Sequence, residues 1–310
     1  MIKVKDIAYV VYNVPNIDVM ESFLVDFGLS TTLKTTDTLY MRTGNGLPYQ
    51  YVAKAATKSN FVCFGFVAER YADLELLVSN KLATKIEVID APGGGYKVVL
   101  EGPDGYIFEV VHGINCSQSD SVRAPLIYNA GTQKSRINKS QRPPKGRVDA
   151  MRLGHCAFTG SNPLLTLEWL QNTLGIKACD YLVSVDNEDE ILGVFMCCDQ
   201  GDKLVDHHCL FVSLSNDIRI HHCSFEVQDL DAVMSGHDFL IKCGYQLEVG
   251  VGRHMAGSQV FDYWIDPFGM RIEHYADGDV VNNQYIHKKI SGTPEGVTQW
   301  GPVPSDKFFQ

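Results

Sequence analysis

Short apolar runs alternate with amphipathic stretches along this chain, and the alternation returns four times. The first run spans 7–12, the second spans 61–67, and the third and fourth begin at His155 and His222. Each run has the length and the β-branched and aromatic content of a strand, and each is followed by a helical pattern and further short strands. Repetition on this scale predicts one strand–helix–strands unit used four times.

The helical segments have recognisable ends. Asn16 can cap the first helix, because its side chain can accept a hydrogen bond from the free N–H groups of the first turn. Glycine favours the left-handed backbone that ends a helix, and Gly28, Gly175 and Gly244 each follow a helical segment. The expected helices are 16–27, about 71–78, about 163–174 and about 230–243.

The second and fourth units close in the same way. Each has a Pro-x-Gly turn, starting at Pro103 or Pro267, and then a strand that carries a glutamate, Glu109 or Glu273. The match supports a duplicated architecture, in which both glutamates stand at equivalent positions.

A polar segment separates the two halves. Residues 131–147 are rich in Lys, Arg, Ser, Gln and Pro, which indicates a linker between domains. Beyond about Asp277 the chain reads as irregular, with 300–304 as an extended tail on the surface. The expected parts are an N-terminal domain at 1–130, a linker at 131–149, a C-terminal domain at 150–290 and a tail at 291–310.

Composition limits the class of protein. A chain of 310 residues is long enough for two domains, and no apolar run reaches the ~18 residues of a membrane span. The first residues read as a strand instead of a signal peptide, and the formal net charge of −10 weighs against nucleic acid as a partner. Nine cysteines without a secretion signal favour buried free thiols in a reducing compartment. We therefore expect a soluble cytoplasmic protein that binds neither membrane nor nucleic acid.

Two histidines and a glutamate stand at equivalent places in the last two units. His155 and His222 open their units, and Glu273 closes the fourth. Two neutral imidazoles and one carboxylate on one face of an octahedral metal leave positions for substrate and O2 side by side, as in non-haem Fe(II) oxygenases. A single strand histidine is more often a core residue than a ligand. The register of all three within repeated units favours a metal site, and with it an enzyme that uses oxygen.

The segment 252–273 adds a signature. It contains His254, Tyr263 nine residues later, an acidic-Pro-x-Gly turn from Asp266 to Gly269, and then Glu273. This pattern resembles the two-domain type I extradiol catechol dioxygenases of the vicinal oxygen chelate superfamily, and the resemblance covers essentially the whole chain. Asp262 departs from it, because the family usually has an apolar residue before the tyrosine.

The resemblance implies an α+β fold of four βαβββ modules in two vicinal-oxygen-chelate (glyoxalase/bleomycin-resistance-like) domains. It implies Fe(II), or Mn(II) with the same ligands, held by His155, His222 and Glu273. His208 would be the acid/base, and His254 and Tyr263 would hydrogen-bond the reactants. The implied reaction of a catechol-type substrate with O2 opens the ring beside its hydroxyls and gives a semialdehyde carrying both oxygen atoms. A homo-oligomer is also expected.

Neighbouring residues are assigned from strand alternation. His221 and His207 should face away from the site, and Cys156 and Cys223 should be core thiols on the opposite face. The N-terminal half should be catalytically silent. Asp6 or Ile7 would match His155 in the first unit, no histidine lies near Phe61, and Glu109 alone holds no metal.

Aromatic residues such as Phe195, Phe211 and Trp264 are expected to wall the substrate cavity. The sequence shows no clear arginine cluster that could pair with a carboxylate on the substrate, although Arg253 and Arg219 lie near site residues. A substrate with a neutral ring is therefore favoured. Two alternatives remain open. One is a metal-dependent isomerase or lyase of the same superfamily that does not use O2, with His208 as a fourth ligand. The other is a non-catalytic protein that sequesters small molecules.

Overall fold

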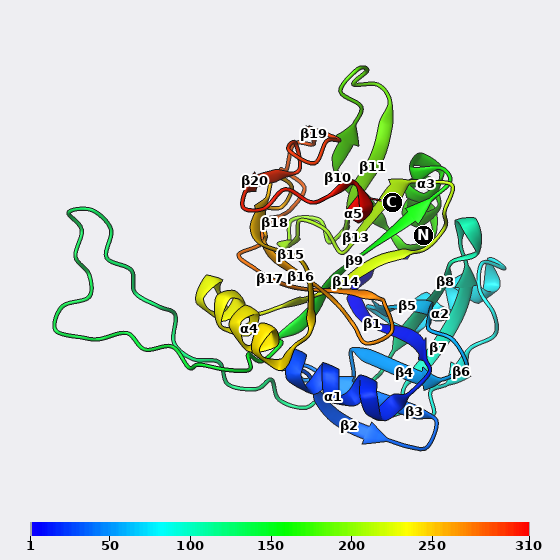
Figure 1. Ribbon diagram of the computed structural model, residues 1–310. Coiled ribbons are helices and arrows are strands. Elements are labelled where there is room, and N and C mark those ends of the chain that lie inside the picture. The colour runs from blue at the N-terminus through cyan, green and yellow to red at the C-terminus, as the bar shows by residue number, and fades with distance from the viewer. Residues whose placement is uncertain (1, 310) are drawn as a thin grey trace.

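Two large curved sheets make up the protein, one above the other (Figure 1). The structure is a computed structural model that describes residues 2–309. Strands of the N-terminal half, blue to cyan, lie below those of the C-terminal half, green to red (Figure 1). The mixed sheets with helices packed on them confirm the expected α+β class.

The first sheet has the strand order β2-β3-β4-β1-β5-β8-β7-β6. Its elements form two modules in chain order. The first module is β1 (Val4–Val14), α1 (Ile17–Phe27), β2 (Ser30–Lys34), β3 (Thr38–Arg42) and β4 (Tyr51–Ala55). The second is β5 (Asn60–Ala68), α2 (Tyr71–Ser79), β6 (Glu87–Val88), β7 (Tyr96–Glu101), the 3₁₀ turn η1 (Pro103–Gly105) and β8 (Ile107–His112).

The second sheet has the order β19-β10-β11-β13-β9-β14-β17-β16-β15-β20. Its first module is β9 (Arg152–Gly160), α3 (Pro163–Leu174), β10 (Ile176–Val183), β11 (Ile191–Cys198) and β13 (Leu210–Leu214). Its second is β14 (Ile220–Glu226), α4 (Leu230–Cys243), β15 (Gln246–His254), β16 (Val260–Ile265) and β17 (Arg271–Ala276). A short pair of β12 (Val205–Asp206) and β18 (Val280–Val281) lies outside both sheets.

The same pairing rule holds in every module. The opening strand runs parallel to the closing strand of its own module, as in β1–β4, β5–β8, β9–β13 and β14–β17. It runs antiparallel to the opening strand of the neighbouring module, as in β1–β5 and β9–β14. The four expected βαβββ modules are therefore confirmed.

The helices begin and end close to where the sequence places them. Asn16 Oδ1 accepts a hydrogen bond from Val19 N at 3.0 Å, and Gly28 ends α1 with a φ of 115°. α3 and α4 cover the expected residues and stop at Gly175 and Gly244 in the left-handed conformation. Local capping chemistry is sufficient to set these ends.

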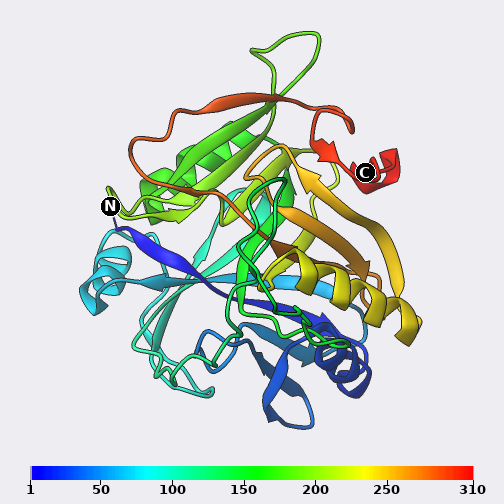
Figure 2. The same ribbon diagram turned by 90° about the vertical axis from the view of Figure 1, so that its left-hand side faces the viewer.

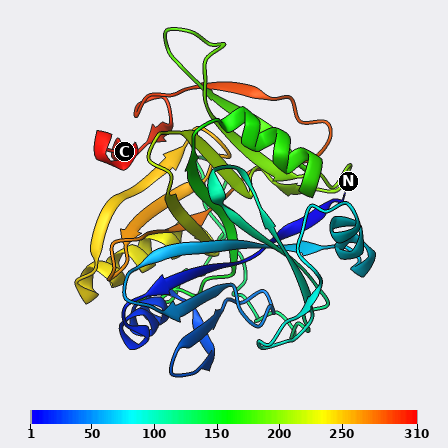
Figure 3. The same ribbon diagram turned by 90° about the vertical axis from the view of Figure 1, so that its right-hand side faces the viewer.

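The two halves share one buried core. β1 and β9 lie against each other, and buried apolar side chains from both sheets form one continuous cluster. α1 and α4 lie side by side at the junction (Figures 2 and 3), where the Tyr245 hydroxyl donates to Asp26 Oδ2 at 2.7 Å. The relative placement of the sheets therefore rests on packing as well as on the linker.

The connection between the halves is longer than its composition suggests. Within the described chain no helix or strand lies between the end of β8 at His112 and the start of β9 at Arg152, apart from an isolated bridge of Ala130 with Gln133. Part of this segment reaches well away from the body (Figure 1). The irregular segment thus starts nearer 113 than 131, because 113–130 makes scattered hydrogen bonds to the body, such as Ser117 N to the Gly46 carbonyl, but joins no sheet.

The expected irregular tail is wrong in part. Beyond Asp277 the chain forms β18, β19 (Lys288–Ser291), β20 (Thr298–Trp300) and the one-turn helix α5 (Asp306–Phe309). β19 pairs with β10 and β20 pairs with β15, so the tail extends both edges of the second sheet. Such short strands depend on their partners and carry little signal of their own.

The cysteines are free thiols in this structure. All nine lie in the described part of the chain and none forms a disulfide. Cys156 and Cys223 face each other across β9 and β14 in the core. No helix within residues 2–309 is long and apolar enough to cross a membrane.

Candidate metal centre

Three neighbouring strands bring the candidate ligands together. Ser224 of β14 pairs with His155 of β9 on one side and with Glu273 of β17 on the other, and His222 lies two residues before it on the same strand. Glu273 Oε2 lies 3.1 Å from His155 Nε2 and 3.4 Å from His222 Nε2, and the two nitrogens are 3.2 Å apart. Sheet pairing, not proximity in sequence, makes this cluster.

The cluster fits a divalent metal. One ligand atom from each of the three residues lies within 4.8 Å of the others, and all three side chains are buried. Neither oxygen of Glu273 has a hydrogen-bond partner among the described residues. Burial opposes the charged form, but close contacts with His155, His254 and His222 outweigh it and hold the pKa of Glu273 well below its usual range. A buried, ionised carboxylate facing two imidazole nitrogens needs a cation to balance it.

A β-bulge changes the expected place of His221. The register of β14 against β9 shifts between Ile220 and His222, so His221 is an extra residue and strand alternation fails there. Its Nδ1 lies 2.7 Å from Nδ1 of His222. The expectation that His221 faces away from the site is therefore wrong.

The contacts of His221 orient the ligand beside it. His221 Nε2 lies 2.7 Å from the carbonyl oxygen of Phe308, which can only accept, so Nε2 carries the proton. Burial lowers the pKa of both His221 and His222 well below the usual value, and in a neutral His221 the Nδ1 atom then accepts from Nδ1–H of His222. His222 Nε2 is left with a lone pair facing the other ligands.

Gln259 has the same role for His155. The amide group of Gln259 lies 3.5 Å from His155 Nδ1, and in this orientation its Oε1 atom is buried without a partner among residues 2–309. Turning the amide over lets Oε1 accept from Nδ1–H, which satisfies the buried oxygen and frees His155 Nε2 for a metal.

His208 stands beside the ligands. Its ring centroid is 4.4 Å from that of His155, and it lines the same cavity. Burial, with the neighbouring His155 and His207, holds the pKa of His208 well below its usual value, so the imidazole is neutral near pH 7. His207 lies outside the cavity lining, as expected, but its Nδ1 is 3.1 Å from His208 Nδ1.

Tyr263 and His254 form a hydrogen-bonded pair next to Glu273. Tyr263 pairs with Glu273 across β16 and β17, and its hydroxyl is 2.8 Å from His254 Nε2. His254 Nε2 also lies 3.8 Å from Glu273 Oε1. Burial and the charge of Glu273 raise the pKa of Tyr263 well above its usual value, so the phenol keeps its proton and remains a donor.

A largely apolar cavity of about 260 Å³ opens onto these groups. Phe195 and Phe211 stack on each other with centroids 4.2 Å apart and line it, as expected. The other apolar lining residues are Leu182, Leu192, Leu214, Ala256, Ile290, Val297, Pro304 and Phe308. Among the described residues, no Lys, Arg, Asp or Glu side chain is part of this lining.

Trp264 is wrongly assigned to the cavity wall. It is fully buried in the core on the other face of β16, where its Nε1–H donates to Asp262 Oδ2 at 2.7 Å. The second oxygen of Asp262 bonds His237 Nδ1 at 2.9 Å, which explains how the sheet tolerates an acid here. Arg253 and Arg219 also lie outside the lining, paired with Asp277 and Asp217.

The register of the first sheet gives the residue that matches His155, and it is neither Asp6 nor Ile7. Tyr9 pairs with Gly65, which in turn pairs with Glu109, just as His155, Ser224 and Glu273 pair in the second sheet. Register shifts between β1 and β5 move the equivalent position away from the residues expected from the sequence.

In the first sheet a lysine neutralises the equivalent glutamate. Glu109 accepts from the Tyr9 hydroxyl and from Lys97 Nζ, each at 2.5 Å. The Tyr9 ring covers Gly65, where a Cβ would come within 2.7 Å of it. The Tyr9 hydroxyl and the Lys97 ammonium group therefore contact Glu109, whereas in the second sheet His155 and His222 lie beside Glu273.

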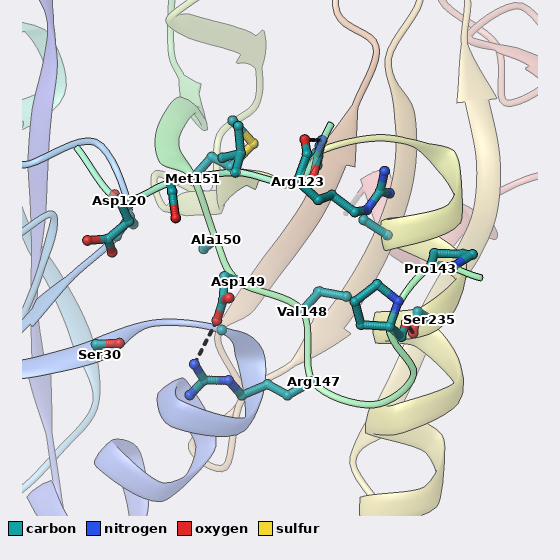
Figure 4. Close-up of a pocket in the computed structure, with 18 of the residues that line it drawn as sticks. Ser30, Asp120, Arg123, Pro143, Arg147, Val148, Asp149, Ala150, Met151 and Ser235 are labelled. Carbon is teal, nitrogen blue, oxygen red and sulfur yellow. Dashed lines mark hydrogen bonds and ion pairs between the residues drawn. The ribbon is translucent and has the colours of Figure 1, made fainter. Parts of the chain in front are cut away.

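Another cavity, of about 220 Å³, lies at the junction of the halves (Figure 4). Its three arginines, Arg42, Arg123 and Arg147, each form an ion pair with an aspartate. The pair of Arg147 with Asp149 is visible as a dashed line in Figure 4. Because the charges of the three arginines are neutralised by these aspartates, we assign no binding or catalytic role to this cavity.

Sequence reasoning missed the residues that support the centre. These are Asp180, His207, His221, Gln259 and Phe308. The two doubled histidines were visible as a signal, but simple alternation discarded the first histidine of each pair. Asp180 and Phe308 come from distant segments, and only the folded chain brings them there.

Known proteins resemble this chain along nearly its whole length, although no family model matches it. It is 27% identical to metapyrocatechase 2 of Cupriavidus necator, over 99% of this chain and 92% of that protein. It is 22% identical to a manganese-dependent 2,3-dihydroxybiphenyl 1,2-dioxygenase of Geobacillus genomosp. 3, over 93% of this chain and 91% of that protein.

Solved structures share the fold. The Mn(II)-bound glyoxalase from Novosphingobium aromaticivorans superposes with a TM-score of 0.81 at 20% identity, covering 99% of this chain and 94% of that one. Homoprotocatechuate 2,3-dioxygenase from Brevibacterium fuscum, in complex with 3,4-dihydroxyphenylacetate, superposes with a TM-score of 0.78 at 16% identity. The match covers 99% of this chain and 92% of that one. Sequence similarity along nearly the whole chain therefore agrees with the expected resemblance to the two-domain type I extradiol dioxygenases, and the solved structures show that the fold is shared.

Proposed function

We propose that the protein uses O2 and one Fe(II) to open the ring of an uncharged catechol that bears an apolar substituent. The observation that carries the proposal is a cluster of His155, His222 and Glu273 at an apolar cavity, with His208 and Tyr263 beside it. The product would be a ring-opened semialdehyde that retains both atoms of O2.

The metal would be held by His155, His222 and Glu273 through Nε2, Nε2 and the carboxylate. When bound, such an ion holds both reactants at its open positions and passes electron density from the ring to O2. Fe(II) is the first candidate, and Mn(II) is the second because one relative is manganese-dependent. The residues that support His155 and His222 keep their Nε2 lone pairs available to either ion.

His208 would act as the base and then as the acid. A catechol must lose a proton to bind through both oxygens, and the neutral imidazole of His208 faces the cavity with Nε2 free, because Nδ1 contacts His207. The resulting imidazolium returns the proton from Nε2 as the ring opens.

Tyr263 and His254 would orient the reacting oxygens. Their mutual hydrogen bond and the pairing of Tyr263 with Glu273 hold the phenol at the edge of the centre. A preorganised donor at this place stabilises negative charge that develops on oxygen during cleavage.

The cavity lining supports an uncharged substrate. A substrate carboxylate would be buried against Phe195, Phe211 and Leu182 without a cation to pair with it. Apolar walls instead stabilise alkyl or aryl substituents by roughly 25 cal/mol per Å² of buried surface.

A metal-dependent isomerase is the second candidate, favoured by the similar fold of the Mn(II)-bound glyoxalase. In that reading His208 would be a fourth ligand. The group of close ligand atoms in residues 2–309 contains His155, His222 and Glu273 but not His208, which supports the oxygenase instead.

Oxygen uptake separates the candidates. Protein prepared without air and loaded with Fe(II) should consume O2 with 3-methylcatechol or 2,3-dihydroxybiphenyl, in a one-to-one ratio with substrate. It should react at least ~10-fold more slowly, by kcat/KM, with 3,4-dihydroxyphenylacetate, because the carboxylate finds no cation. Loading with Mn(II) in parallel shows which ion supports turnover. Bound metal without any catechol-dependent uptake would rule out the dioxygenase.

A further inference from the structure

A buried chain of polar side chains runs from His208 to the far side of the second sheet. His207 and Asp180 are both 1% exposed, and His207 Nε2 lies 2.9 Å from Asp180 Oδ2. At its other end, His207 Nδ1 lies 3.1 Å from Nδ1 of His208. Each ring nitrogen of His207 therefore has one defined partner.

Asp180 is held as a carboxylate, and both of its oxygens accept hydrogen bonds. Its Oδ1 accepts the backbone N–H of Lys288 at 2.8 Å, and the Tyr285 hydroxyl donates to both oxygens at 3.1 and 3.2 Å. Burial opposes ionisation, but the hydrogen bonds from His207 and from the Lys288 amide outweigh it and hold the pKa of Asp180 below its usual value. Asp180 can thus only accept hydrogen bonds.

The carboxylate of Asp180 determines which atoms donate and which accept in the series of hydrogen bonds from Asp180 through His207 to His208. Because Asp180 only accepts, His207 must carry its proton on Nε2, and a neutral His207 then offers a lone pair on Nδ1. His208 must donate Nδ1–H to that lone pair. The proton of a neutral His208 therefore lies on the buried nitrogen, and its Nε2 atom presents a lone pair to the cavity.

We propose that Asp180 and His207 are positioning residues that select the Nδ1–H tautomer of His208, so that Nε2 is the base for the catechol hydroxyl. This inference rests on the proposed function of His208 as the acid/base. His207 and Asp180 touch neither substrate nor metal ligand and act through the orientation of one imidazole. The arrangement follows the logic of an acid that orients a catalytic histidine in hydrolases.

Asp180→Asn tests the proposal with almost no change in shape. The Lys288 amide keeps the Asn oxygen at the Oδ1 position, so the new NH2 group faces His207 Nε2. His207 must then carry its proton on Nδ1 and donate it to His208, which moves the His208 proton to Nε2. We expect kcat to fall by roughly 10²–10⁴-fold while KM, metal content and Tm change little.

Three control variants separate positioning from general damage. Tyr285→Phe removes another hydrogen bond to Asp180 without reversing any donor, and kcat should stay within about 3-fold of the wild type. His207→Gln can donate to Asp180 and accept from His208, so it should retain most of kcat, whereas His207→Leu should lose as much as Asp180→Asn. Equal loss in His207→Gln and His207→Leu would overturn the proposal.

The tautomer of His208 can be determined by NMR, without measuring enzyme activity. The ¹⁵N shifts of histidine-labelled, Zn(II)-loaded protein distinguish Nδ1–H from Nε2–H, and His208→Gln assigns the signal. The wild type should show Nδ1–H at His208 and Asp180→Asn should show Nε2–H; an Nε2–H proton in the wild type overturns the proposal. If the wild type consumes no O2 with any catechol, the proposed function fails, while this spectrum still decides the tautomer.

Discussion

At the scale of single residues, the site depends on which nitrogen of each histidine carries its proton. Gln259, His221 and His207 each contact Nδ1 of a histidine in the centre, so that Nε2 is free in all three cases. The types of the inner residues could be inferred from sequence, because metal and acid/base chemistry require them. Their tautomers depend on partners that only the fold supplies.

Glu273→Gln should abolish metal binding, because an amide replaces the anionic ligand at a buried site. Glu109→Gln is the matched control, since Glu109 occupies the equivalent position of the first sheet and binds Lys97 instead. Metal analysis after desalting should find close to one ion per chain in the control and none in Glu273→Gln. Metal lost from Glu109→Gln and kept by Glu273→Gln would contradict the assignment.

His274 should make the protein less stable in acid. Burial lowers the pKa of His274 to about 4 and outweighs the Nε2–H···O hydrogen bond to the Phe27 carbonyl at 2.6 Å and the charge of Glu273, which both raise it. Nδ1, which would take up the proton, is buried without a partner among the described residues. The unfolded chain takes up this proton near pH 6.5 and the folded one only near pH 4, so stability is complete above pH 6.5 and falls between those values.

The loss attributable to His274 should reach about 3 kcal/mol at pH 4. In urea unfolding from pH 4 to 8, His274→Gln should show a shallower fall of the unfolding free energy on acidification than the wild type. Identical slopes would show that another group carries the effect.

At the scale of elements, helices were easier to foresee than edge strands. α1, α3 and α4 are set by apolar periodicity and by local caps, so their bounds follow from the sequence. β19 and β20 exist because β10 and β15 offer them an edge, and the bulge in β14 is visible only against β9. Non-local hydrogen bonds decide such features, and a single sequence does not display them.

The C-terminal helix α5 should contribute to metal retention. The carbonyl of Phe308 accepts from His221, which in turn orients His222. A chain that ends at Val303 should therefore hold its metal roughly 10-fold more weakly in competition with a chelator. Phe308→Leu keeps the carbonyl and should stay closer to the wild type. Unchanged affinity in the truncated chain would show that His222 needs no such support.

At the scale of the whole molecule, duplication produced two similar frameworks with different contents. The same pairing of three strands holds Tyr9, Gly65 and Glu109 in one sheet and His155, Ser224 and Glu273 in the other. In the first sheet Lys97 balances the glutamate, and the buried charge is neutralised within the chain. In the second sheet we propose that a metal ion balances the charge of Glu273.

Lys97→Met should therefore destabilise the protein without affecting the metal. It leaves Glu109, which is mostly buried, with the Tyr9 hydroxyl as its one remaining partner in the described part of the chain, at a cost of about 1–3 kcal/mol. Thermal unfolding should show the loss, and metal content should equal that of the wild type. A variant as stable as the wild type would mean that Lys97 contributes no net stabilisation.

The sequence by itself determined the module pattern, most helix ends and the three candidate ligands, because periodicity, capping and metal chemistry are local properties of residue types. The resemblance to extradiol dioxygenases added His208, His254 and Tyr263 as predictions. Only the tertiary structure decided that Tyr9 matches His155, that His221 stands beside His222, and that Trp264 lies outside the cavity. These outcomes depend on bulges and on contacts between distant segments. A shift of one residue in strand register moves a side chain to the other face, and no local pattern records that shift.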